Sequence, residues 1–131
     1  MKTSIVLIRL GGLINLLIGV LHISYWRLFD WSEELSLLSL DNSNIVQMLN
    51  LFSIVFFFYT AFVLLVMPRR LLSNAAGRIF IGMFVTLYLS RLAMEFYFPN
   101  GSLVFAIFMI ITVLFFTLPL VQTNRLSHAN Q

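Results

Sequence analysis

Four long apolar stretches, separated by short polar connectors, constrain the fold of this chain more than any other feature. They cover residues 4–25, 44–67, 78–98 and 103–121. A helix needs about 20 apolar residues to cross roughly 30 Å of hydrocarbon, and each stretch meets that length. Only 10% of the residues are charged and 60% are hydrophobic, whereas soluble domains carry about 25% charged residues. We therefore expect a single all-α domain over residues 1–131, folded as a transmembrane four-helix bundle.

The first stretch carries a stripe of small and polar residues along one face. The members recur at steps of three and four, which places them on the same side of a helix; they are Gly12, Asn15, Gly19, His22 and Trp26. Membrane helices associate through close packing at small residues and through hydrogen bonds between polar ones. The stripe therefore predicts the face that meets another helix.

The connector between the first two stretches predicts a short helix at the membrane surface. Asp30 and Glu33 have the spacing of a capping box at a helix N-terminus. Trp31, Leu35 and Leu38 fall on one side of the helix that would follow, as in helices that lie in the interface plane. We expect an interfacial helix over about residues 30–40, acting as a structural connector or as a lid over a pocket.

The third stretch is the one span that carries an acid. Tyr88, Arg91 and Glu95 follow one another at steps of three and four. A charge at the bilayer centre costs about 2.5–3.5 kcal/mol on insertion scales, so charged residues within a span mark a candidate site. Glutamate before arginine is the better order for a pair four residues apart, and the macrodipole disfavours an anion near a helix C-terminus. Both arguments predict that Arg91 or Glu95 reaches towards another helix.

Polar residues of two other spans are expected at the same depth as this acid. Counting inward at about 1.5 Å per residue puts His22, Gln47 and Asn50 roughly 5–9 Å below the outer interface. The same count puts Glu95 and Arg91 roughly 5 and 10 Å below it. We therefore predict one polar layer in the outer half of the bundle, in which Arg91 or Glu95 contacts His22, Gln47 or Asn50.

The basic residues predict the orientation in the membrane. Four spans place both termini and the loop after residue 67 on one side of the bilayer. Most basic residues fall on that side, namely Lys2, Arg69, Arg70, Arg78 and Arg125, while the opposite connector holds four of the five acids. By the positive-inside rule, both termini are expected in the cytoplasm. The predicted location is the inner (cytoplasmic) membrane, as a multi-pass protein.

The residue types present leave little room for a metal centre or a haem. The chain has no cysteine, and His22 and Glu95 alone are too few for the usual three or four protein ligands of a metal. His22 is expected in the outer layer and His128 on the cytoplasmic tail, so the two cannot bind one iron within a monomer. We assign no metal ligand, no catalytic residue and no cofactor from the sequence.

The pattern favours a non-enzymatic membrane protein that binds a ligand or serves as an accessory subunit. Mostly apolar pockets with a few converging polar groups are the usual form of small-molecule sites, and a lipid-soluble molecule such as a quinone would suit one here. The alternative is a membrane enzyme or redox accessory protein that uses His22, Arg91 and Glu95. A transporter is a third class, and the polar layer is also consistent with interhelical bonding alone or with a docking surface for a partner subunit or a second copy. The basic residues do not form a patch, so nucleic acid is not an expected partner.

The layout resembles that of a known group of membrane proteins. Four spans, a histidine at the end of the first (His22) and the Arg91-x-x-x-Glu95 pattern near the end of the third are similar to features of small four-span bacterial inner-membrane proteins of unknown function. In size and layout the chain looks broadly like the DoxX-like group. This resemblance implies a four-helix bundle in the cytoplasmic membrane and transfers no functional residue.

Overall fold

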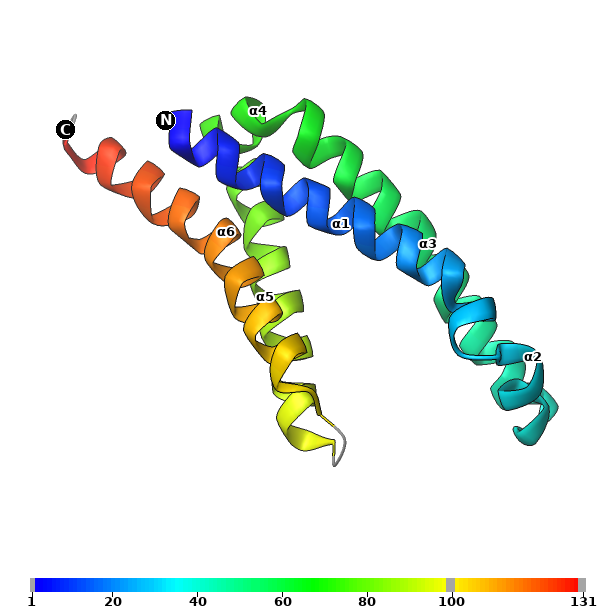
Figure 1. The fold of residues 1–131 in the computed structure, drawn as a ribbon. Coiled ribbons are helices and arrows are strands. Elements are labelled where there is room, and N and C mark those ends of the chain that lie inside the picture. Colours follow the sequence, from blue (N-terminus) through cyan, green and yellow to red (C-terminus); the bar gives the residue numbers. More distant parts are fainter. Residues whose placement is uncertain (1, 99–100, 130–131) are drawn as a thin grey trace. The chain divides into compact units, whose positions relative to one another are not determined.

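The computed structural model describes residues 2–98 and 101–129, with side chains up to Thr123. This part of the chain is all-α, as predicted, and contains no strand. The elements are α1 (Lys2–Leu28), α2 (Trp31–Glu34), the 3₁₀-helix η1 (Leu35–Leu37), α3 (Leu40–Val66), α4 (Pro68–Ser73), α5 (Ala75–Tyr97) and α6 (Leu103–Ala129). Among the described residues, α1, α3, α5 and the Leu103–Thr123 part of α6 are long and apolar enough to cross a membrane (Figure 1).

The four long helices correspond to the four predicted spans, and most of their ends lie beyond the predicted bounds. Helix α3 begins at Leu40 instead of residue 44, and helix α6 continues to Ala129 instead of ending at residue 121. The proline at position 68 ends α3 as expected and opens the short helix α4, because proline has no backbone N–H and is best tolerated in the first turn of a helix.

Two compact units make up the chain. One unit combines residues 1–11 with residues 64–131, and the other comprises residues 12–63. Helices α1 and α3 therefore contribute residues to both units.

In the unit of residues 12–63, α1 packs against α3 through the predicted stripe. The Asn15 side chain donates to Thr60 Oγ1 at 3.0 Å, and both residues are buried. One turn further on, a Cβ on Gly19 would lie 3.0 Å from the ring of Phe58, so the small residue allows a close approach of the two helices. The prediction that this face of the first span meets another helix is confirmed.

The connector at the end of this unit differs from the predicted interfacial helix. Asp30 has φ 44°, in the left-handed region, and its side chain makes no capping bond. Its backbone carbonyl instead accepts from the N–H groups of Glu33 and Glu34. The helix covers only Trp31–Glu34, followed by one 3₁₀ turn, and extended backbone at Leu38 ends it. A short helix between the first two long helices is therefore confirmed, but it is shorter than residues 30–40. The expected capping box was wrong, because backbone bonding at a tight turn replaces the side-chain cap.

In the other unit, stacked aromatic rings join α5 and α6. The ring of Phe116 stacks on Phe84 at 5.0 Å between centroids and on Tyr88 at 5.9 Å. All three are buried. Gly11 of α1 lies against the same cluster, where a Cβ would overlap with the Phe116 ring. Helix α6 therefore has a well-packed face.

The junction of α4 and α5 is fixed by one asparagine and one glycine. Asn74 caps α5, because its side-chain oxygen accepts from the N–H of Gly77 at 2.7 Å, and its amide group donates to the carbonyl of Arg70 at 2.7 Å. A Cβ at Gly77 would overlap with the backbone of Leu71. This close approach holds α4 in a defined position at the start of α5.

Candidate functional site

The most developed polar contact of the unit of residues 12–63 joins His22 of α1 to Asn50 of α3. Asn50 donates through Nδ2 to the backbone carbonyl of His22 at 3.1 Å, and its Oδ1 lies 2.8 Å from the ring Nδ1 of His22. An amide oxygen only accepts, so Nδ1 of the imidazole carries the hydrogen in this arrangement. Two bonds between the same two residues fix both the ring and the amide, and Nε2 is the imidazole nitrogen left for other interactions.

Aromatic rings surround the imidazole. The His22 ring stacks on Phe57 of α3 at 5.5 Å between centroids, with an interplanar angle of 24°. The ring of Tyr25, one turn along α1, lies 4.6 Å from the imidazole between centroids, and it also packs on the ring of Trp31 in the connector. The imidazole is therefore held by one hydrogen-bonded partner and two aromatic neighbours, and it acts as a positioning residue for Asn50.

A groove of about 420 Å³ lies beside this pair, between the end of α1 and the Gln47–Ile54 part of α3. Its lining is Ile23, Trp26, Gln47, Met48, Asn50, Leu51 and Ile54. The Gln47 amide donates to Ser43 Oγ at 3.2 Å, which leaves its carbonyl oxygen as an acceptor at the groove. The groove is open, because most of its apolar side chains are exposed, but its volume and its mixture of apolar residues with two amides fall within the range of small-molecule sites.

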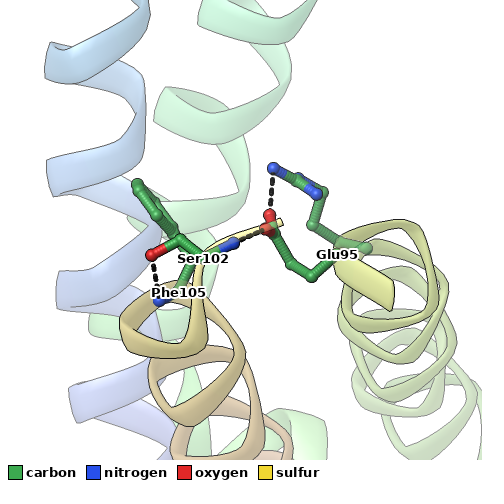
Figure 2. A network of polar contacts seen from close by, with 4 residues as sticks. Glu95, Ser102 and Phe105 are labelled. Carbon is green, nitrogen blue, oxygen red and sulfur yellow. Dashed lines mark hydrogen bonds and ion pairs between the residues drawn. The ribbon is translucent and has the colours of Figure 1, made fainter. Parts of the chain in front are cut away.

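The predicted charged residues lie in the other unit and pair with each other. Arg91 and Glu95 form an ion pair within α5 at 2.5 Å, with 51% of the Arg91 side chain and 7% of the Glu95 side chain exposed. Glu95 also accepts from the backbone N–H of Ser102 at 2.9 Å (Figure 2). The expectation that pairing within the helix is disfavoured was therefore wrong.

The physical reason is the hairpin that follows Glu95. Ser102 directly precedes α6, and its hydroxyl accepts from the N–H of Phe105, as expected of an N-cap (Figure 2). The carboxylate thus lies at the end of α5 and also at the N-terminus of α6, where free N–H groups favour an anion. The favourable dipole of the second helix offsets the unfavourable dipole of the first.

The six predicted site residues therefore fall into two groups. His22, Gln47 and Asn50 come together at the groove, whereas Tyr88 packs on Phe116 and the Arg91–Glu95 pair closes the α5–α6 hairpin. The two groups belong to different units. That they form one layer, with a bond from Arg91 or Glu95 to the other group, stays a prediction.

Sequence reasoning missed several polar residues that the structure uses. Thr60 bonds to Asn15, and Ser102 bonds to Glu95. A further bond runs from Ser4 to Gln122 at 2.6 Å. Ser102 carried a signal, because a serine between a glycine and an apolar run is typical of a helix N-cap. Thr60 carried none, since a threonine hydroxyl in a membrane helix can also bond to its own backbone, as Thr60 does to Phe56.

These features define the class of protein to which the chain belongs. Four candidate membrane-spanning helices indicate a multi-pass membrane protein, and the described residues include no group of three His, Cys, Asp or Glu side chains placed to hold a metal ion. Comparisons with protein-family models, with curated proteins and with solved structures found no match to this chain.

Proposed function

We propose that this chain is a small protein of the inner (cytoplasmic) membrane that binds a lipid-soluble small molecule in the groove beside Asn50, without catalysing a reaction. The observation that carries the proposal is the doubly bonded His22–Asn50 pair at the edge of that groove. Fixing a buried amide in this way prepares a polar group for a ligand at low entropic cost. The proposal agrees with the resemblance to small four-span bacterial inner-membrane proteins.

The chemistry of the lining suggests the kind of molecule that binds. Gln47 and Asn50 supply amide groups, and Trp26 supplies an indole ring, while the remaining lining is aliphatic or methionine. A flat or aliphatic molecule with one or two carbonyl or hydroxyl groups would match this set, because each polar group would meet an amide and the rest would meet apolar side chains. A quinone head group is one molecule of this kind.

We further propose that both termini lie in the cytoplasm and that the groove lies in the outer half of the membrane. The charge distribution supports this orientation, because the basic residues gather beside the termini and the α4 segment. The absence of native cysteine allows a direct test with single-cysteine variants. In intact cells, a membrane-impermeant maleimide should label Ser36→Cys and should leave Ser73→Cys unlabelled. The reverse labelling pattern would refute the orientation.

The binding proposal is tested by purifying the protein gently from its membrane and recording an absorption spectrum and a mass-spectrometric inventory of bound molecules. We expect one small molecule in stoichiometric amount. Gln47→Leu should lose it and keep the helical signal, whereas Asn44→Leu, which changes an exposed amide one turn earlier, should retain it. A preparation that carries only a co-purifying membrane protein would contradict the proposal in favour of an accessory subunit, and equal retention by both variants would contradict the groove as the site.

A further inference from the structure

A second groove, in the unit of residues 1–11 and 64–131, is lined by three arginines. It has a volume of about 410 Å³ and lies where the first turns of α1 meet the end of α3 and the start of α4. Its lining is Ile5, Arg9, Val66, Met67, Pro68, Arg69 and Arg70. Positive charge and apolar surface thus share one concave site, which neither the proposed ligand site nor the α5–α6 hairpin uses.

The three guanidinium groups have no acidic partner in the described part of the chain. The ion pair found there joins Arg91 to Glu95. Four of the five acids of the sequence lie between residues 30 and 41, in the other unit. Glu95 lies twenty residues along α5 from Ala75, the first residue of that helix, which is roughly 30 Å at 1.5 Å per residue. Among the described residues of this unit, no acidic side chain pairs with the three arginines, so the groove carries net positive charge.

The backbone around the groove is defined. Pro68 opens α4, and Asn74 and Gly77 fix the other end of this helix through the cap and the close approach described above. Arg69 and Arg70 are consecutive residues of this held segment. Arg9 lies seven residues into α1, roughly 10 Å from its start, so its guanidinium has to reach the headgroup region or bind an anion there. The apolar residues Ile5 and Val66 lie beside it.

We propose that this groove binds the phosphate group of an anionic phospholipid. Arginine recognises phosphate through paired N–H donors in a fixed plane, and basic pockets between membrane helices bind anionic headgroups. A free phosphate would gain nothing from Ile5, Val66 and Met67, whereas the glycerol and first methylenes of a lipid would cover them. The mixture of guanidinium groups and aliphatic side chains therefore favours a lipid over a soluble anion.

The test uses the full-length protein in neutral detergent, titrated with phosphatidylglycerol and with phosphatidylcholine that has the same acyl chains. Native mass spectrometry counts the lipids that stay bound. We expect saturable binding of phosphatidylglycerol and no saturable binding of phosphatidylcholine. Because each arginine near a lipid headgroup contributes about a fivefold gain in affinity, Arg69→Gln/Arg70→Gln should weaken phosphatidylglycerol binding about 25-fold.

The matched control is Arg78→Gln, which removes an arginine of α5 that does not line the groove. It should change the affinity less than threefold. Equal weakening by Arg78→Gln and by the double variant would overturn the proposal, because surface charge alone would then explain the binding. Competition by inorganic phosphate at the same concentration as the lipid would also overturn it, since the site would then bind soluble anions.

Two further variants keep the proposal falsifiable if the double glutamine variant does not fold. Arg9→Gln changes a residue of a different helix and should weaken phosphatidylglycerol binding about fivefold. Arg69→Lys/Arg70→Lys preserves the charge and the topology signal but removes the paired donors, so it should bind with an affinity between those of the wild type and Arg9→Gln. Wild-type affinity in Arg9→Gln would exclude the groove as the binding site.

Discussion

Replacing Arg91 is predicted to destabilise the α5–α6 hairpin more than replacing its partner Glu95. The Glu95 side chain is 7% exposed and the Arg91 side chain 51% exposed, so replacing the arginine leaves a nearly buried carboxylate with one remaining donor, the N–H of Ser102. Removing one partner of a fully buried pair costs about 3–5 kcal/mol. Because Arg91 is half-exposed and the bond from Ser102 remains, we expect Arg91→Leu to cost about 1–3 kcal/mol.

The opposite substitution is predicted to be mild. Glu95→Gln removes the buried charge, and the amide oxygen can still accept from the N–H of Ser102, so we expect a loss below about 1 kcal/mol. The double variant Arg91→Leu/Glu95→Gln should be about as stable as Glu95→Gln alone, because no unpaired carboxylate remains. The order of the three stabilities therefore tests the reasoning. If the buried acid is what needs its partner, Arg91→Leu alone is the least stable variant, whereas two independent side chains would give additive losses in the double variant.

Equilibrium unfolding by SDS in mixed micelles, followed by far-UV circular dichroism and by amide exchange in α5 and α6, measures these differences. Tryptophan fluorescence is a poor probe here, because Trp26 and Trp31, the two tryptophans of the chain, lie in the unit of residues 12–63. An Arg91→Leu protein within 0.5 kcal/mol of the wild type (less than about a threefold change in the unfolding equilibrium), or a Glu95→Gln protein less stable than Arg91→Leu, would refute the reasoning.

Three glycine substitutions give further tests, each read as a change in the free energy of unfolding by the same titration. Gly77→Ala should destabilise by about 1–3 kcal/mol, because the new Cβ overlaps with the backbone of Leu71, which cannot move without disturbing α4. Gly82→Ala, five residues further along α5, meets nothing within 4 Å and should stabilise by up to about 1 kcal/mol through helix propensity; a loss there would contradict the packing described. Gly11→Ala should destabilise by about 1–3 kcal/mol through overlap with the ring of Phe116, and Phe116→Leu in the same chain should recover part of that loss.

The helices themselves were predictable from the sequence. Length and apolar content alone determine where a membrane span can be, and the four predicted spans correspond to four observed helices. The packing face of α1 was also predictable, because Gly19 and Asn15 recur at the helical period and small or polar residues gain little by facing lipid. The helix ends were less predictable, since α6 continues through polar residues to Ala129.

The pairing of side chains was only partly predictable. Counting residues gives the depth of a side chain in a span, so His22 and Asn50 were expected at similar depths, and they bond. The same count gives no direction around the helix axis, so it did not identify which partner each would choose. The partners of Glu95 were not predictable from its own helix, because one of them, the N–H of Ser102, belongs to the N-terminus of α6.

The position of Glu95 has a consequence for how this protein enters the membrane. Its carboxylate is satisfied by Arg91 and by Ser102, and both belong to the stretch of chain from α5 to the start of α6. The hairpin therefore brings its own counter-charge to its own acid. We therefore expect this hairpin to need no contact with α1 or α3 to neutralise its acid during membrane insertion, whereas the Asn15–Thr60 and His22–Asn50 bonds form only when α1 meets α3.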